Sequence, residues 1–282
     1  MALPPGVASY GDPTYWEARF AGGEEAYEWC GGWGDGCLAG ACRPALSAAR
    51  RVLVLGAGAS SLPFDLADEG EAGMLPLLEA VVATDISPTA VARMGARIAR
   101  RTPGGRVALS AAVADMTSLP YPAASFDAVL EKGTFDVLEV AGDDGRPPDP
   151  WAPPPEVAAR MHAALGEAHR VLTPAGGLLL SITWAPPLFR RGHYLDDPRY
   201  DWGGPEAVVG GVGGAVPIVA YSLTRGCPPA ERARWARPRP GERGAGEPPP
   251  AGLPRATGHD HMDDEDAFLG AIGVGDSDDD DE

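Results

Sequence analysis

Glycines and aspartates stand directly after several of the apolar runs in this sequence. The informative ones are Gly56, Gly58, Asp85 and Asp115. Glycines after a buried strand let the backbone turn tightly, and they leave N–H groups and the positive end of a helix dipole facing a ligand. An aspartate after the next strand can accept hydrogen bonds from two ribose hydroxyls. Together these residues predict a site for an adenosine-type cofactor.

The glycine turn also distinguishes between two classes of adenosine cofactor. The turn reads GAGASS, with Ser61 where a dinucleotide fingerprint has its third glycine. That glycine allows a helix to pack closely on a strand beside a pyrophosphate, so its absence argues against NAD. Asp115 can accept a hydrogen bond from an adenine amino group while Met116 packs on the ring. The residues therefore favour S-adenosyl-L-methionine over a dinucleotide.

Alternating strands and helices must position these residues. Five apolar runs predict strands at 52–55, 81–84, 107–113, 126–130 and 178–183. Helices are predicted between them, and two weaker runs, at 206–209 and 216–223, predict a closing hairpin. The alternation predicts an α/β fold with a doubly wound, Rossmann-like seven-strand sheet that is mostly parallel. Ligands of such sheets bind at the C-terminal ends of the strands.

Aromatic residues are concentrated before the first predicted strand. Tyr15, Trp16 and Phe20 recur at helical spacing, and Trp29 follows in the motif YEW. Such a helix either packs on the edge of the domain or forms a lid over the cofactor, and the spacing fits both arrangements.

The charge of the chain is negative and unevenly distributed. Of the formal net charge of −17, eleven acidic residues lie between Asp260 and Glu282, a stretch without Lys or Arg. This balance argues against direct binding to nucleic-acid phosphates. A secretory leader and a bilayer-spanning apolar run are both missing from the pattern, so we expect a cytoplasmic protein without membrane contact. The cysteines do not have the spacing of a zinc module, and we predict no metal site.

The sequence resembles the seven-strand S-adenosylmethionine-dependent methyltransferases, and within them the branch that methylates lysine in translation elongation factor 1-alpha. The motifs that carry the resemblance are YWEARF, YEW, VLVLGAGAS, SFDAVLEKGTFD, EAHRVLTPAGG and RRGHY. The resemblance implies a protein-lysine methyltransferase with an elongation-factor-like protein substrate. A small-molecule methyltransferase with the same cofactor site, and a non-catalytic scaffold with this fold, are the alternatives.

The strand ends and the resemblance together indicate the site. The residues expected to contact the cofactor are Trp16, Phe20, Trp29, Gly56, Gly58, Asp85, Ile86, Asp115, Met116 and Lys132. The resemblance also implies that the segment 131–136 is needed for activity, with Glu131 and Lys132 as the candidate catalytic residues. Glu131 either orients the incoming amine or acts as a helix cap or ion-pair partner of Lys132. Lys132 is expected to contact the carboxylate end of the cofactor.

Two positions depart from the pattern of that branch. Ala59 stands where relatives carry Asn, and Phe20 stands where they carry Tyr. Each change removes a hydrogen bond worth about 1 kcal/mol, so weaker cofactor binding is expected.

Composition divides the chain into four parts. We expect disorder over 1–9, a methyltransferase domain over 10–226 with a lid at 10–50, a linker rich in Pro, Arg and Gly over 227–258, and a disordered acidic tail over 259–282. The last two parts contain too few apolar residues to offset the entropy lost on ordering.

Overall fold

The computed structural model describes most of the predicted methyltransferase domain. The described residues are 10–23, 28–35, 37–101, 104–139, 154–185, 190, 193–194, 197–204, 206–210 and 218–232. The predictions for 1–9, for the acidic tail and for most of the linker fall outside these residues.

Seven strands form one sheet in the order β3-β2-β1-β4-β5-β7-β6. The strands are β1 (Arg51–Leu55), β2 (Ala80–Asp85), β3 (Ala108–Val113), β4 (Ala128–Lys132), β5 (Leu178–Thr183), β6 (Glu206–Gly210) and β7 (Ile218–Thr224). The strands from β3 to β5 pair in parallel, and β7 is antiparallel to both of its neighbours. The predicted sheet, mostly parallel with a closing hairpin, is confirmed.

The central strands are buried along almost their whole length because both of their faces are covered, and most of their residues are apolar. In β4 and β5 all residues are buried, and in β1 only Arg51 is exposed. Continuous apolar runs of this kind are typical of parallel strands between two layers of helices. This is why strand positions were predictable to within two residues.

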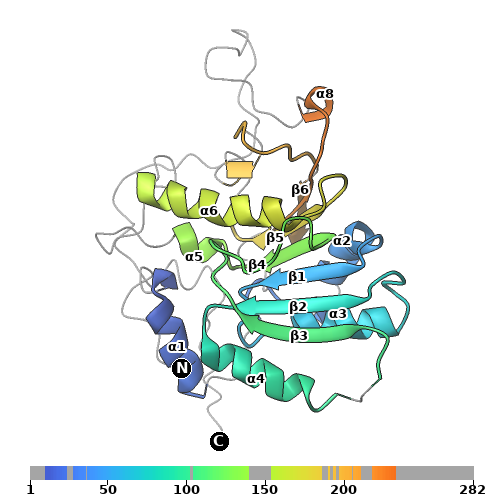
Figure 1. The fold of residues 1–282 in the computed structure, drawn as a ribbon, viewed down its shortest axis with the longest axis vertical. Coiled ribbons are helices and arrows are strands. Elements are labelled where there is room, and N and C mark those ends of the chain that lie inside the picture. The colour runs from blue at the N-terminus through green and yellow to red at the C-terminus, as the bar shows by residue number, and fades with distance from the viewer. Residues whose placement is uncertain are drawn as a thin grey trace, which may run out of the picture.

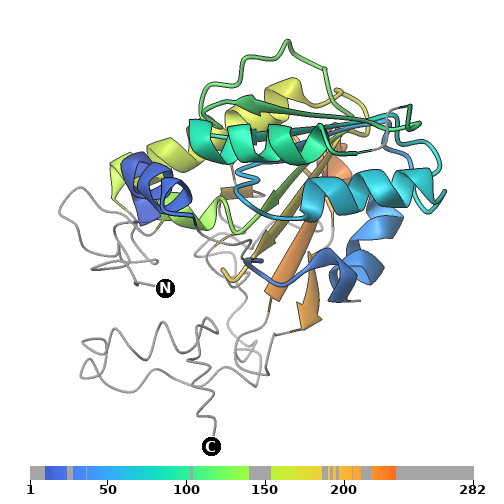
Figure 2. The same cartoon turned by 90° about the horizontal axis from the view of Figure 1, so that it is seen from below.

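Helices lie on both faces of the sheet. The helices are α1 (Pro13–Ala21), the short 3-10 helix η2 (Trp33–Asp35), α2 (Cys37–Leu46), α3 (Leu62–Glu71), α4 (Pro88–Ile98), α5 (Asp136–Glu139), α6 (Pro155–Val171) and α8 (Pro229–Arg232). One hydrophobic core joins one face of the sheet to α2, α3 and α4, and a second core joins the other face to α5 and α6. Figure 2 shows the orange strands β6 and β7 at the opposite edge of the sheet from the teal α4. The doubly wound arrangement is confirmed.

Two of the helices that flank the site begin with a capping side chain. Asp12 accepts a hydrogen bond from Thr14 N at the start of α1, and Ser87 accepts one from Ala90 N at the start of α4. A capping side chain of this type satisfies a backbone N–H that has no partner inside the helix. In the part of the chain that the structure describes, no helix is long and apolar enough to cross a membrane.

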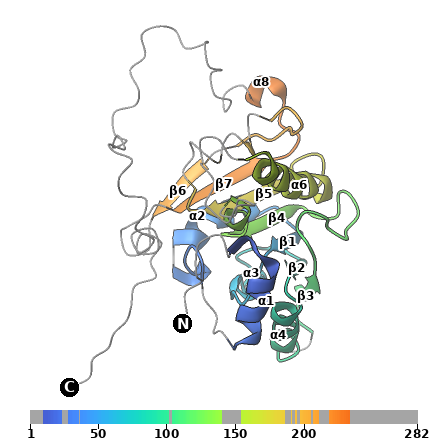
Figure 3. The same cartoon turned by 90° about the vertical axis from the view of Figure 1, so that its left-hand side faces the viewer.

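Helix α1 lies at the C-terminal ends of the strands. In Figure 1, the arrowheads of β1 and β2 point towards the side on which α1 lies, and Figure 3 shows α1 beside α4. The first helix of the chain therefore reaches the edge of the sheet at which ligands of this fold class bind.

Candidate functional site

The turn after β1 requires glycine at two positions. Gly56 has φ +56° and Gly58 has φ +50°, in the left-handed region where other residues are strained. A Cβ on Gly56 would lie 2.2 Å from Thr134 Cγ2, and a Cβ on Gly58 would lie 3.2 Å from the ring of Phe20. The close contact with Thr134 therefore excludes a side chain at position 56, whereas a side chain at position 58 would be strained and would need the Phe20 ring to shift.

Asp85 joins this turn to the start of α4. Its buried carboxylate accepts hydrogen bonds from Gly58 N at 2.8 Å and from Ser87 N at 2.9 Å. Burial raises the pKa of Asp85, while these backbone donors oppose the rise. Two carboxylate oxygens offer about four acceptor sites, so Asp85 retains capacity for the ribose hydroxyls that we expect it to bind.

The other predicted strand-end residues lie along the same edge. The sheet register pairs Asp85 with Val113, which places Asp115 two residues beyond that pair. Asp115 is exposed and accepts a hydrogen bond at 2.8 Å from the backbone N–H two residues further on. Met116 is half-buried against the second core, and Ile86 is 39% exposed. The structure thus brings the glycine turn and both aspartates together, with apolar side chains beside them.

The aromatic rings of the N-terminal segment form a continuous series over the glycine turn. Ring centroids are 5.6 Å apart for Tyr10 and Trp16, 6.1 Å for Trp16 and Phe20, and 6.2 Å for Trp16 and Trp29. Phe20 is the member that lies against Gly58. This contact fits the lid interpretation, which stays a prediction.

A further aromatic residue, Trp184, was missed by the sequence reasoning. Its ring centroid lies 5.8 Å from that of Trp29, in an edge-to-face arrangement. Gly133, with φ +68°, lies against both, since a Cβ there would be 3.4 Å from Trp29 Cβ and 3.6 Å from Trp184. The sequence signal that could have identified Trp184 is its position, since it is an aromatic residue directly after the fifth predicted strand.

Glu17 of α1 is bound at the first turn of α4. Its carboxylate accepts hydrogen bonds from Ser87 Oγ, from Thr89 Oγ1 at 2.5 Å and from Thr89 N at 3.2 Å. The hydroxyl donors of Ser87 and Thr89 lower the pKa of Glu17. A negative charge is favourable at a helix N-terminus, so this contact fastens α1 beside Asp85.

Glu28 makes the equivalent contact with α3. Its carboxylate accepts hydrogen bonds from Ser61 N at 2.6 Å and from Ser60 Oγ at 2.7 Å, and it pairs with Lys132 Nζ at 2.9 Å. Burial opposes ionisation of Glu28, but the charge of Lys132 and the two serine donors outweigh it and lower the pKa. The predicted contact of Lys132 with the cofactor stays a prediction, and in this structure its partner is Glu28.

Glu131 points into the protein interior and caps the start of α5. Its side chain is fully buried, and one oxygen accepts hydrogen bonds from Thr134 N at 2.9 Å and Phe135 N at 3.0 Å. The other oxygen accepts a hydrogen bond from Ser181 Oγ. Burial, together with the neighbouring Asp136, raises the pKa of Glu131 to about 7. Of the roles considered for Glu131, this geometry is that of a cap.

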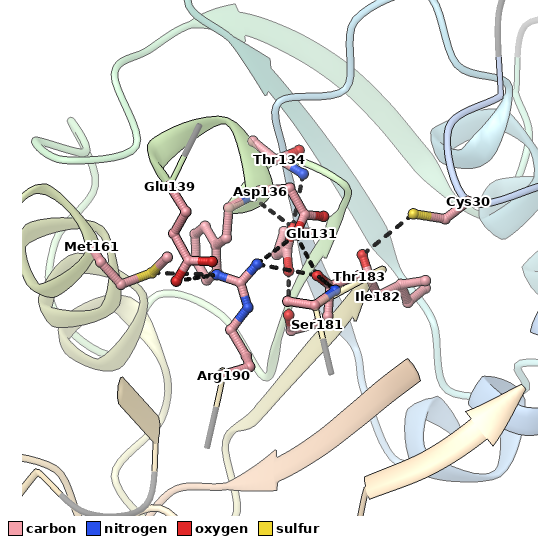
Figure 4. Close-up of polar contacts among 12 residues, drawn as sticks. Cys30, Glu131, Thr134, Asp136, Glu139, Met161, Ser181, Ile182, Thr183 and Arg190 are labelled. Atoms are coloured by element: carbon pink, nitrogen blue, oxygen red, sulfur yellow. Dashed lines mark hydrogen bonds and ion pairs between the residues drawn. The ribbon is translucent and has the colours of Figure 1, made fainter. Parts of the chain in front are cut away.

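Behind β4 lies an ionic cluster, in which Glu131 and Arg190 are completely buried and Asp136 and Glu139 are partly exposed (Figure 4). Arg190 is completely buried, and its Nη2 lies 2.5 Å from Asp136 Oδ1 while its Nη1 lies 3.2 Å from Glu139 Oε1. Burial raises the pKa of Asp136, whereas Arg190 overcomes the effect of burial on Glu139 and lowers its pKa. Arg190 belongs to the motif RRGHY, and the cluster fixes the segment 131–136 from the side opposite Lys132.

Comparisons with known proteins indicate the same class of protein. A family model described as a methyltransferase domain matches residues 53–180, from β1 to β5. The chain is 36% identical over 202 residues to EEF1A lysine methyltransferase 4 of Mus musculus, covering 71% of each chain. It is 34% identical over 184 residues to the eEF1A lysine and N-terminal methyltransferase of Homo sapiens, covering 65% of this chain and 23% of that protein.

One solved structure is also similar in fold. It is described as the conversion of a disulfide bond into a thioacetal group during echinomycin biosynthesis, and it matches with a TM-score of 0.51 at 17% identity. The match covers 79% of this chain and 97% of that one. At this level of identity the likeness shows the fold.

Proposed function

Because the chain belongs to the methyltransferase family that includes EEF1A lysine methyltransferase 4, we propose that it methylates a lysine of translation elongation factor 1-alpha. As a member of this family it is an S-adenosyl-L-methionine-dependent enzyme. The acceptor assignment is supported by the relatives, several of which carry eEF1A lysine methylation in their names. With this acceptor we also propose a cytoplasmic location and a protein partner.

We base the placement of the cofactor on the hydrogen bond that Gly58 N donates to Asp85. It holds the glycine turn and a ribose-binding carboxylate at one edge of the sheet. The residues present fit the cofactor, since Gly56 and Gly58 leave the turn without side chains and Asp85 has acceptor capacity for a diol. We assign Asp115, Met116 and Ile86 to the adenine, and Trp16, Phe20 and Trp29 to the covering lid.

The sulfonium of the bound cofactor supplies an electrophilic methyl group, so the protein has mainly to orient and desolvate the acceptor. A lysine amine has a pKa of about 10.4, and presenting it neutral at pH 7 costs about 4 to 5 kcal/mol. Exclusion of water from the amine disfavours the ammonium form and reduces this cost, and we propose that Trp29 and Trp184 contribute to that exclusion.

Glu131 acts by shaping the segment 131–136 and not by touching the acceptor. Both of its oxygens already accept hydrogen bonds from within the protein, and its side chain has no exposed surface. The segment that it shapes carries Thr134, whose Oγ1 donates to Leu55 O at 3.1 Å beside the glycine turn. A rigid 131–136 segment thereby supports the turn that receives the cofactor.

The proposal is tested with purified elongation factor 1-alpha and S-adenosyl-L-methionine labelled in its methyl group. We expect label on a lysine of the factor with the wild-type chain and none with Asp85→Ala, because that variant loses the ribose acceptor. Asp68→Ala, which removes an exposed aspartate on α3, is the matched control and should retain activity. Self-labelling gives little background, because Lys132 is the one lysine of the chain.

Two outcomes would contradict the assignment. Label that appears only in small molecules from a cell extract would point to a metabolite as the acceptor. Binding of the cofactor without any transfer, to protein or to small molecules, would point to a scaffold that retains the fold.

A further inference from the structure

The single lysine of the chain gives all of its hydrogen bonds to the N-terminal segment 28–31. Lys132 Nζ donates to Glu28 Oε2 at 2.9 Å, to Gly31 O at 3.2 Å and to Trp29 O. An ammonium group has three donors, so these acceptors use all of them. The side chain of Lys132 is 5% exposed. All three hydrogen-bond donors of the Lys132 ammonium group therefore bind this segment.

The backbone of the segment is bent so that its carbonyl groups meet this ammonium. Cys30 has φ +58° and Gly31 has φ +81°, two successive residues in the left-handed region. For Cys30 this conformation is strained, and such strain persists only where the surroundings hold it. Cys30 is 1% exposed and its Sγ lies 3.8 Å from Ile182 O, a contact drawn in Figure 4. Lys132 and the burial of Cys30 together maintain the bend.

Glu28 extends the connection from Lys132 to the glycine turn. The carboxylate that pairs with Lys132 also accepts hydrogen bonds from Ser60 Oγ and Ser61 N, at the start of α3. One carboxylate thus joins the end of β4, the N-terminal segment and the helix that follows Gly56 and Gly58. Loss of either member of the ion pair would remove this connection and weaken the attachment of the segment to the edge of the sheet.

The bend also determines where Trp29 lies. Trp29 packs on Gly133, the residue after Lys132, and meets Trp184 from across that glycine. It also contacts Trp16 of α1. The conformation of the segment 28–31 therefore sets the position of the aromatic series over the cofactor edge.

From these contacts we infer that Lys132 is a positioning residue, which supports the reaction by anchoring the lid through Glu28 and the carbonyls of Trp29 and Gly31. The inference rests on the proposed function, because the anchored lid covers the site that we assign to S-adenosyl-L-methionine. This role differs from direct contact between Lys132 and the cofactor. The two roles predict different effects of substituting Glu28 on the affinity for the cofactor.

A chemical probe measures the anchor without the cofactor. Reductive methylation with formaldehyde and borohydride modifies amines, and Lys132 and the chain's N-terminal amine are the two amines present, so the N-terminal amine is an internal reference. We expect Lys132 to react more slowly than that reference in the wild type. Glu28→Gln should speed its reaction about tenfold, the change expected for one charge-assisted hydrogen bond. Glu79→Gln, an exposed change of the same type, should leave the rate unaltered.

Calorimetry with S-adenosyl-L-methionine separates the two roles. If Lys132 acts through the lid, Glu28→Gln and Lys132→Met each weaken binding about tenfold, and the double variant is no weaker than Lys132→Met. If Lys132 binds the cofactor directly, Glu28→Gln leaves affinity unchanged or improves it, which would overturn the inference. An unaltered rate of Lys132 modification in Glu28→Gln would overturn it as well. Absence of cofactor binding by the wild type would instead refute the proposed function, while the modification rates still test the anchor.

Discussion

Two neighbouring residues of β4, one acidic and one basic, lie in different surroundings on opposite faces of the strand. Lys132 turns towards the N-terminal segment, where Glu28 accepts one of its hydrogen bonds beside the glycine turn, whereas Glu131 turns into the ionic cluster around Arg190. Successive side chains of a strand point to opposite faces, so this division follows from the strand itself. One short segment therefore contacts both the N-terminal segment that we propose as the lid and the ionic cluster behind β4.

The carboxylates of the two regions are stabilised in different ways. At the lid, Glu17 and Glu28 meet helix N-termini, hydroxyls and a lysine, and both have lowered pKa values. In the cluster, burial dominates and raises the pKa of Glu131 and of Asp136, with Arg190 as the compensating charge. The hydrogen bonds of Glu17 can open at modest cost because they leave no buried cation behind, whereas loss of Arg190 leaves two carboxylates without their compensating charge. The Glu28–Lys132 pair lies between these cases, because the side chain of Lys132 is 5% exposed. We expect the lid to control binding and the cluster to control stability.

The largest effect is expected from Arg190→Met. This change removes the completely buried cation that pairs with Asp136 and Glu139, whose side chains are 19% and 23% exposed. Removing one partner of a fully buried ion pair costs about 3 to 5 kcal/mol, which is the upper limit for this change. The free energy of unfolding in urea measures the loss. Arg50→Met breaks a pair in which both side chains are more than half exposed, and it should cost at most about 1 kcal/mol.

Arg190→Lys keeps a charge in the cluster but not the guanidinium geometry, so its stability should fall between wild type and Arg190→Met. This variant keeps the prediction testable if Arg190→Met does not fold. Equal losses in the free energy of unfolding for Arg190→Met and Arg50→Met would show that the cluster stabilises the fold no more than an exposed ion pair does.

An intermediate effect is expected from pH acting on Glu131. Its pKa is raised from 4.5 to about 7, so the folded chain keeps this proton at pH values where the unfolded chain has lost it. Relative to Glu131→Gln, the stability of the wild type is therefore greatest below pH 4.5 and falls as the pH rises to about 7. The slope is at most about 1.4 kcal/mol per pH unit.

Urea unfolding of both proteins below, within and above this window measures the trend. Glu139→Gln is the control from the same cluster, because the pKa of Glu139 is lowered. Its stabilising contribution is complete above pH 4.5, so its difference from wild type should stay constant across the window and be lost only as the pH falls further. A constant difference for Glu131→Gln would contradict burial as the dominant effect on Glu131.

Local patterns in the sequence revealed the strand ends of the candidate site better than they revealed the contacts of the lid or of the cluster. Gly56, Gly58, Asp85 and Asp115 follow apolar strands directly, so local patterns were sufficient to find them. The contacts of Glu28 with Lys132 and of Arg190 with Asp136 join residues 104 and 54 positions apart, and no local pattern indicates such pairs. The sequence did, however, predict a strand at this point, and successive side chains of a strand point to opposite faces. This alternation already argued against an ion pair between the adjacent Glu131 and Lys132, and the structure shows them with separate partners.

The smallest effect on stability is expected from Glu17→Gln. The carboxylate of Glu17 lies on the surface between α1 and α4, so its loss should leave the free energy of unfolding near that of the wild type. It should still loosen α1, because Ser87 and Thr89 lose an anionic acceptor at the N-terminus of α4. We expect acrylamide to quench tryptophan fluorescence more strongly, and cofactor affinity to fall less than in Glu28→Gln, which loses the lysine contact as well. A loss of stability as large as that of Arg190→Met would mean that the contacts of the lid stabilise the fold as strongly as the cluster does. The expectation that the lid controls binding and the cluster controls stability would then be wrong.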